Sequence, residues 1–197
     1  MCGIFGLAIG EDLKLSPKEL MEIINGVFKL SESRGKEASG LAVRFQNSIY
    51  VFKEPITSSK LVKTKKYKEL FNQTLKAQIY DGEKLKAPIL ILGHSRLQTN
   101  GQSEINTNNQ PVVKDGAVGI HNGIIVNDAK LWSDYPNLKK KYDVDTEVFL
   151  SLLQMHRAQG KSIVEAVKQV FGQIEVSSSV ALQIDDANNF VLASNTG

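Results

Sequence analysis

The chain has 197 residues, of which 42% are hydrophobic and 23% are charged, as is typical of a soluble globular protein with a sizeable core. Its net charge of +3 is mild, and its lysine clusters at 60–68 and 139–141 accompany no nucleic-acid motif, so they indicate solvated surfaces. A single cysteine excludes an internal disulfide framework, and no apolar run is long enough to predict a membrane-spanning helix. We therefore expect a cytoplasmic protein with neither nucleic acid nor membrane as a partner.

The first predicted elements are a strand and a helix. An apolar run at 4–9 predicts a buried strand that begins two residues after Cys2, so the N-terminus should be anchored to a sheet. Ser16 is a suitable N-cap for the helix that follows, and Glu19 completes a capping box. Apolar residues at helical spacing then predict one buried face, and the helix should end before Gly35.

The middle of the chain predicts a hairpin, a helix and a long loop. Strand-like segments at 39–45 and 48–52 indicate the hairpin. The stretch 56–86 is lysine-rich and carries Tyr67, Leu70, Phe71 and Leu75 at helical spacing, which indicates a surface helix with exposed flanks. A buried strand is expected at 89–92. The polar loop 97–110 that follows carries four asparagines and no obvious core, and loops of this length are often functional.

The second half of the chain alternates strands and helices. The expected order is a strand at 117–120, a short helix capped by Asn127, a helix at 146–157, a helix begun by the capping box Ser162–Glu165 and closed by Gly172, and a closing hairpin over 180–193. Antiparallel strand pairs with helices between and outside them predict an α+β fold.

Cys2 is the first candidate for chemistry. Once Met1 is removed, this residue would carry a thiol and a free α-amine together. An α-amine has a pKa of roughly 7.7–8.0, so near neutral pH it can accept the thiol proton. The alternative is a buried or incidental thiol.

Two further candidates suit an amide substrate. Asn122 followed by Gly123 can offer a side-chain amide and a backbone N–H to one oxyanion, although the same pair can form a plain turn. Arg96 lies in the loop after a buried strand and is suited to hold a carboxylate through two hydrogen bonds, although this loop can also be a simple surface connection.

Two more segments are open to a structural reading. Asp145 can cap the helix that follows it, or it can face a positively charged substrate amine. Arg34 and Gly35 can mark a helix C-terminus with glycine as its cap. The three histidines are scattered, and the glycines near the N-terminus lack dinucleotide-loop spacing, so we expect no metal and no cofactor.

Taken together, these segments resemble the glutaminase domain of class II glutamine amidotransferases, particularly the subgroup with glucosamine-6-phosphate synthase and amidophosphoribosyltransferase. The resemblance covers the chain from residue 2 to about residue 195 and follows the family's order. Its marks are Cys2-Gly3-Ile4-Phe5-Gly6, Arg34-Gly35 with Ser39-Gly40, Gly93-His94-Ser95-Arg96 with Thr99 and Gly101, His121-Asn122-Gly123, and Asp145-Thr146-Glu147.

The resemblance implies the four-layer αββα sandwich of N-terminal nucleophile hydrolases. It implies that Cys2 attacks the glutamine carboxamide, releases ammonia and leaves a γ-glutamyl thioester that water cleaves. Asn122 and the Gly123 N–H match the family's oxyanion hole, and Arg34 matches an arginine that organises the surroundings of the nucleophile.

The resemblance also implies how glutamine is bound and where ammonia goes. Arg96 matches the residue that binds the α-carboxylate, Asp145 the one that binds the α-ammonium, and Thr99 lines the same pocket. The sequence contains no acceptor domain, so an acceptor domain or subunit outside this chain is the expected partner. The resemblance also admits a homo-oligomer. We expect one glutaminase domain over 1–197 that ends before the family's last strands.

Two positions depart from the sugar-synthase pattern, which has an aromatic residue where this chain has Leu97 and histidine where it has Asn100. They concern the acceptor subgroup more than the glutaminase step. Two alternatives stay open: an N-terminal cysteine amidohydrolase that acts on another amide such as a γ-glutamyl peptide, and a non-catalytic glutamine-sensing module.

Overall fold

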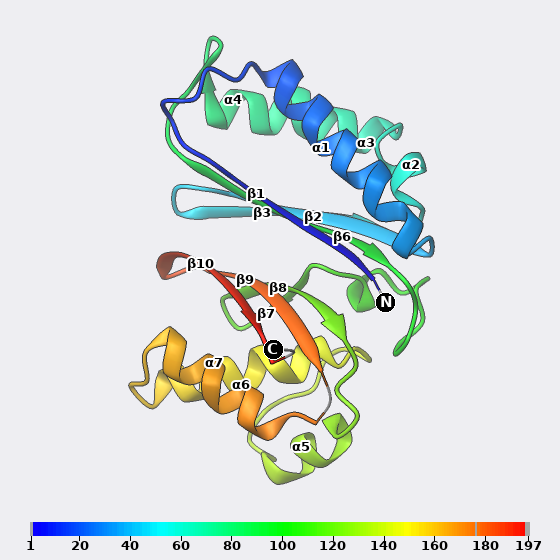
Figure 1. The fold of residues 1–197 in the computed structure, drawn as a ribbon, viewed down its shortest axis with the longest axis vertical. Coiled ribbons are helices and arrows are strands. Elements are labelled where there is room, and N and C mark those ends of the chain that lie inside the picture. Colours follow the sequence, from blue (N-terminus) through cyan, green and yellow to red (C-terminus); the bar gives the residue numbers. More distant parts are fainter. Residues whose placement is uncertain (1, 176, 196–197) are drawn as a thin grey trace.

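A computed structural model describes residues 2–175 and 177–195, so the expected removal of Met1 concerns a residue outside the described ones. Two antiparallel sheets face each other, and helices cover the outer face of each sheet (Figure 1). This arrangement is the four-layer αββα sandwich, so the expected α+β architecture is confirmed.

The first sheet contains the N-terminal strand. Its order is β1 (Gly3–Ile9), β6 (Ile89–Arg96), β2 (Ala38–Phe45) and β3 (Ser48–Glu54). Its outer face is covered by α1 (Pro17–Ser31), α2 (Ser58–Leu61), α3 (Lys65–Glu69) and α4 (Lys76–Ile79) (Figure 1). The predicted capping box is present, since the Ser16 and Glu19 side chains each accept from the other residue's backbone N–H.

The second sheet follows the same plan with the later part of the chain. Its order is β10 (Ala187–Ser194), β9 (Ser178–Ile184), β8 (Ala117–Gly123) and β7 (Val112–Lys114). The helices α5 (Asp128–Asp134), α6 (Thr146–Ala158) and α7 (Ile163–Gln173) lie on its outer side (Figure 1). The capping box of α7 is confirmed, but this helix continues past Gly172 to Gln173, so Gly172 does not close it.

Three apolar clusters hold the layers together. One lies between the first sheet and its helices, and one between the second sheet and its helices. A smaller cluster joins the two sheets, and its buried members are Ala42, Leu92, Val118, Ile120 and Ala181. Small and branched side chains at this interface let the sheets approach closely. Within the described ranges, no helix has the length and apolar character needed to cross a membrane.

The lysine-rich stretch 56–86 is helical at the predicted apolar positions, but it forms several short helices rather than one surface helix. It contains α2, α3, a π-helical turn at Leu70–Leu75 and α4, and it ends in a small hairpin of β4 (Tyr80–Asp81) and β5 (Lys84–Leu85). Tyr67 is fully buried in this layer, and its hydroxyl donates to Asn25 Oδ1 at 2.8 Å. The lysines project outward, and Tyr67, Phe71 and Leu75 of the predicted apolar face are buried, as expected of an amphipathic surface helix.

The Asn127 side chain also differs from expectation. It makes no capping bond to α5, although Asn127 occupies the N-cap position. Its amide instead donates to the Gln173 carbonyl at 2.8 Å and accepts from the Glu175 N–H at 3.0 Å. Asn127 therefore ties the start of α5 to the end of α7.

Strand pairing brings the N-terminus to the end of a distant strand. Because β1 and β6 run antiparallel with Gly3 opposite Ser95, the start of β1 meets the end of β6 at Arg96. The last residues of β8, Asn122 and Gly123, reach the same end of the sandwich from the second sheet. The first sheet therefore contributes the start of β1 and the end of β6 to the site, and the second sheet contributes the end of β8.

Candidate active site

Cys2 lies in an open pocket of about 440 Å³ at this end of the sandwich. Asn122 from β8 and Arg34 from the turn after α1 line the same pocket. The other lining residues are Gly3, Ile4, Phe5, Val27, Leu30 and Ser31. The pocket thus combines three of the predicted site residues with an apolar wall from β1 and α1.

The Cys2 main chain is held by the second sheet, and its thiol by the first. The Cys2 nitrogen donates to Asn122 Oδ1 at 3.1 Å. The sulfur lies 3.4 Å from both the N–H and the carbonyl of Leu97. Leu97 directly follows β6. Because both contacts are to its backbone, the position of the sulfur does not depend on which side chain stands at residue 97.

The surroundings of the Cys2 thiol disfavour its charged form. Burial raises the pKa of the Cys2 thiol above its usual range, and the negative charge of Asp145 acts in the same direction. The Leu97 hydrogen bond and the positive charge of Arg96 oppose this effect without reversing it. A thiol with a raised pKa needs a base to become a nucleophile.

Asn122 and Gly123 do not form the alternative Asn-Gly turn. They are the last two residues of β8 and stand opposite Ser179 and Ser178 of β9. A Cβ on Gly123 would lie 2.7 Å from His121 Nε2 and from the Ser177 carbonyl. Glycine is therefore required by packing here, and the strand places the Asn122 amide beside Cys2.

Arg96 is buried with 3% of its surface exposed, so the plain surface-loop reading of this position is wrong. Its guanidinium donates to Asn109 Oδ1 at 2.6 Å, to the Gly101 carbonyl at 2.8 Å and to the Asn100 carbonyl. These bonds use three of the five guanidinium donors, as far as the structure describes the chain. The geometry holds the guanidinium firmly and leaves donors for a ligand.

The loop 97–110 is organised by buried amides that the sequence reasoning missed. Asn108 and Asn109 are 1% and 0% exposed. Asn109 Nδ2 donates to the Ser103 carbonyl at 2.7 Å, and Asn108 Oδ1 accepts from the Asp143 N–H at 2.9 Å. The signal was the run of asparagines itself, because amide side chains can replace the backbone hydrogen bonds that a loop lacks.

Asp145 does not cap α6 through its side chain, although it occupies the N-cap position. Its Oδ2 accepts from the Ile125 N–H at 2.8 Å, and its Oδ1 lies 3.7 Å from His121 Nδ1. Asp145 is 3% exposed, and its charge acts on both Cys2 and Arg96. The side-chain cap alternative is therefore wrong, and the buried carboxylate is bound to the Ile125 backbone, near enough to Cys2 and Arg96 for its charge to act on both.

Glu147 anchors the segment that carries Asp145, a role that the sequence reasoning did not assign. Its carboxylate accepts from the N–H groups of Lys141 and Tyr142, with shortest distances of 2.8 and 2.7 Å. Lys114 Nζ lies 2.9 Å from the same carboxylate, and both side chains are essentially inaccessible to solvent. This buried ion pair fixes the start of α6 to β7.

Thr99 and Arg34 lie less deeply than the other candidates. Thr99 is exposed at the start of the loop, and no hydrogen bond joins its side chain to another described residue. Arg34 is exposed at the pocket rim. Gly35 has φ −168°, so it is extended rather than a left-handed helix cap, and a Cβ there would collide with the Ser95 and Arg96 carbonyls.

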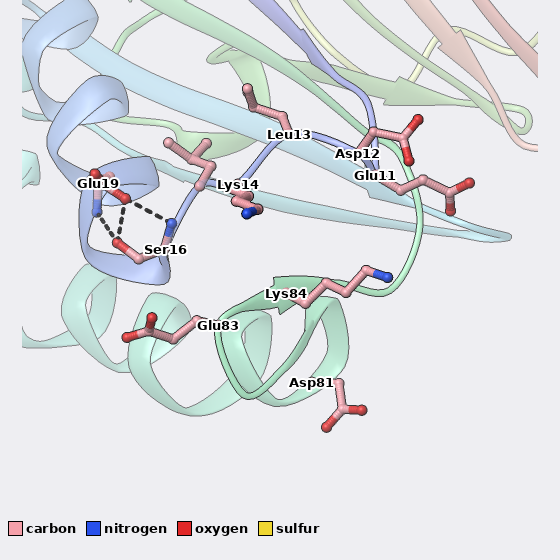
Figure 2. Close-up of a pocket in the computed structure, with 10 residues that line it drawn as sticks. Glu11, Asp12, Leu13, Lys14, Ser16, Glu19, Asp81, Glu83 and Lys84 are labelled. Atoms are coloured by element: carbon pink, nitrogen blue, oxygen red, sulfur yellow. Dashed lines mark hydrogen bonds between the residues drawn. The ribbon is translucent and has the colours of Figure 1, made fainter.

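A larger hollow of about 660 Å³ lies at the far end of β1, away from Cys2. Figure 2 shows the carboxylates of Glu11, Asp81 and Glu83 turned in different directions, while Glu19 is occupied by the capping box with Ser16. Within residues 2–175 and 177–195, no group of His, Cys, Asp and Glu side chains could hold a metal ion. This hollow gives no sign of chemistry.

Comparison with known proteins gives one family. The family described as "Glutamine amidotransferase domain" matches residues 94–195. Curated relatives include glutamine–fructose-6-phosphate aminotransferases (isomerizing). The one from Shouchella clausii is 29% identical over 198 residues, covering 99% of this chain and 29% of the relative. The one from Bacillus licheniformis is 30% identical over 184 residues, covering 92% of this chain and 27% of the relative. The chain thus spans less than a third of the length of these relatives.

Solved structures agree at the level of the fold. Glutamine phosphoribosylpyrophosphate amidotransferase from B. subtilis, complexed with ADP and GMP, has a TM-score of 0.64 at 18% identity over 97% of this chain and 36% of that one. A structure titled as the allosteric regulatory enzyme of purine biosynthesis has a TM-score of 0.66 at 16% identity, over 96% of this chain and 36% of that one. The family match covers more than half of the 197 residues and includes the strand ends that carry Arg96 and Asn122. The chain therefore belongs to the glutamine amidotransferase domain family.

Proposed function

We propose that Cys2, freed of Met1, hydrolyses the side-chain amide of glutamine to glutamate and ammonia through a γ-glutamyl thioester. The observation that carries this proposal is the 3.1 Å hydrogen bond from the Cys2 nitrogen to Asn122 Oδ1. It places the residue's thiol and main-chain nitrogen beside a side-chain amide, in one pocket that is open to a substrate.

The α-amine of Cys2 is the proposed base. Burial raises the pKa of the Cys2 thiol, so a preformed thiolate is disfavoured and the proton must be transferred during attack. The sulfur attacks the carboxamide carbon and forms the C–S bond while the amine takes the thiol proton. The resulting ammonium returns this proton to the leaving nitrogen, ammonia departs, and water then cleaves the thioester.

The oxyanion of the tetrahedral intermediate is assigned to Asn122 and Gly123. Because Asn122 Oδ1 accepts from Cys2, its Nδ2 donors are left to face the reacting carbonyl. The Gly123 backbone N–H is the second proposed donor. Two donors fixed by a strand cost no reorganisation when charge develops. Arg34, at the rim, is proposed to organise the pocket around the nucleophile.

The two charged ends of glutamine have one complement each. We assign the α-carboxylate to Arg96, whose guanidinium is held by the loop 97–110. We assign the α-ammonium to Asp145, which is buried and whose negative charge acts on both Cys2 and Arg96. Thr99 is exposed on the same loop and is proposed to border the bound substrate.

The acceptor of the ammonia is proposed to lie outside this sequence. The curated relatives are named for amino transfer from glutamine to fructose 6-phosphate, and this chain covers only 27–29% of the two relatives described above. Their similarity favours a sugar phosphate as acceptor, supplied by a further domain or subunit.

Intact-mass measurement tests the proposal. We expect 6-diazo-5-oxo-norleucine, a reactive glutamine analogue, to add once and covalently to Cys2 in protein that lacks Met1, and glutamine to protect against the addition. Cys2→Ala protein is the matched control and should show no adduct. An unmodified wild-type protein, or an adduct that persists in Cys2→Ala, would contradict the mechanism.

A further inference from the structure

Two cations share one asparagine beneath the loop 97–110. Arg96 Nη1 donates to Asn109 Oδ1 at 2.6 Å, and Lys53 Nζ donates to the Asn109 carbonyl at 2.6 Å. In the described part of the chain, neither cation has a carboxylate within ion-pair distance. Two neighbouring positive charges with no carboxylate in direct contact repel each other, and a bound anion would relieve this repulsion.

Lys53 holds the end of the loop onto the first sheet. Its ammonium also donates to the Pro111 carbonyl at 2.9 Å, so it bridges two carbonyls of the 109–111 segment. Its partner in β2 is Gly40, where a Cβ would meet the Gln110 carbonyl. The segment therefore lies directly on β2 and β3, and the motif glycine at position 40 is required by this contact.

Asn109 transmits this anchoring to the guanidinium. Its side chain is fully buried and locked at both ends, since Oδ1 accepts from Arg96 and Nδ2 donates to the Ser103 carbonyl. Asn106 closes the arrangement by donating to the Lys53 carbonyl at 2.8 Å. A shift of Lys53 would thus move Asn109 and with it the orientation of Arg96.

We propose that Lys53 is a positioning and specificity residue for the substrate's free α-carboxylate. It holds Asn109 against Arg96, and its positive charge and that of the guanidinium together form a subsite that binds an anion. The inference rests on the proposed function, because it takes Arg96 as the group that binds the carboxylate. It favours free glutamine over glutamine whose α-carboxylate is blocked as an amide or a peptide.

The environment of Lys53 gives this proposal a pH signature. Burial, followed by the charge of Arg96, lowers the pKa of Lys53 to about 8. His94 on β6 is the other titratable group that faces Lys53, and Glu54, next along β3, pairs with Lys66. The neighbouring Gly40 and the segment 109–111 contain no titratable side chain. The Lys53 charge is present below about pH 8 and is lost above it, so the KM for glutamine should rise above about pH 8.

The test is steady-state glutamine hydrolysis by the Met1-free chain from about pH 6.5 to about pH 9.5. Lys53→Met should raise KM roughly tenfold at neutral pH with kcat within about twofold, because the carboxylate contact is the same in ground and transition states. Lys53→Arg stays charged, so it should keep a near-normal KM and show a smaller rise above about pH 8 than wild type, since only the α-ammonium of the substrate still loses its charge there. Lys66→Met is the matched control, because it removes a lysine that is 75% exposed, and it should behave as wild type.

The outcomes separate this inference from the proposed function. Wild-type protein that fails to hydrolyse glutamine would overturn the proposed function and, with it, this inference. Two results with active wild-type protein would overturn only the inference on Lys53. One is a normal KM in Lys53→Met, and the other is a rise in KM at high pH in Lys53→Arg that is as large as in wild type. If Lys53→Met does not fold, as judged by thermal melting, the pH profile of Lys53→Arg decides.

Discussion

The main-chain nitrogen of Cys2 and the side-chain oxygen of Asn122 are joined by a 3.1 Å hydrogen bond across 120 residues of sequence. This bond connects the first sheet to the second at the proposed nucleophile. It also orients the Asn122 amide, because an oxygen committed to Cys2 leaves the nitrogen to donate elsewhere. One side chain thus holds the proposed base and leaves an amide donor for the proposed oxyanion.

Asn122→Asp should therefore be far more damaging than its near-identical shape indicates. The carboxylate has no N–H to donate and places negative charge where an oxyanion forms, so we expect kcat for glutamine to fall by roughly 10²–10³-fold. Steady-state kinetics measure this directly. Asn72→Asp, on an exposed position of the helical layer, is the control. A kcat for Asn122→Asp within about threefold of the wild-type value would exclude the oxyanion assignment.

Arg96→Ala and Asp145→Ala should act mainly on substrate binding. Each removes one charge-assisted contact to an end of glutamine, so we expect KM to rise by roughly 10–100-fold with a smaller change in kcat. Inhibition by glutamate should weaken in parallel, since the product keeps both ends. Normal glutamine hydrolysis by both variants would show that the substrate assignment is wrong.

Local patterns predicted much of the fold, because their signals lie within a few residues. The capping boxes at Ser16 and Ser162 are examples, and the strand expected at 89–92 is present but continues to Arg96. The environment of a side chain depends instead on distant partners. Asp145 was open to a capping role until the fold placed the Ile125 N–H beside its carboxylate.

The same limit explains the residues that were missed. The residues near Lys53 in the sequence do not predict its contact with Asn109, and those near Glu147 do not predict its ion pair with Lys114. Both contacts form only when distant loops and strands assemble. The division of 56–86 was missed for a related reason. Its apolar spacing predicted a helical face that buries Tyr67, but not the break into short helices and a terminal hairpin.

His94 should make the stability of the protein depend on pH. It is fully buried, its ring nitrogens have no hydrogen-bond partner among the described residues, and burial lowers its pKa to about 3. Its unfolded pKa is about 6.5, so the unfolded state binds more protons between these values. The stability contribution is present above about pH 6.5 and is lost as pH falls toward 3, with a slope approaching roughly 1.4 kcal/mol per pH unit.

Urea unfolding from about pH 7 to about pH 4.5 measures this effect. His94→Leu removes the titrating ring, so its free energy of unfolding should fall less steeply with acidification than that of wild type. NMR of the ring provides an independent check, and a His94 signal that titrates near pH 6 would contradict the prediction.

Removing one partner of the Lys114–Glu147 ion pair should destabilise the protein more than replacing both partners with apolar residues. Lys114→Met leaves the Glu147 carboxylate buried with only backbone donors, so we expect a loss of about 3–5 kcal/mol in the free energy of unfolding. The double variant Lys114→Met/Glu147→Leu removes both charges and should be less destabilised than the sum of its single variants, because no lone charge is left in the core. Denaturant unfolding of the four proteins measures the coupling. Lys130→Met, which removes an exposed ion pair with Asp134, is the control and should change stability little. If the change in unfolding free energy of the double variant equals the sum of the changes in the single variants, Glu147 holds Lys141 and Tyr142 without help from Lys114.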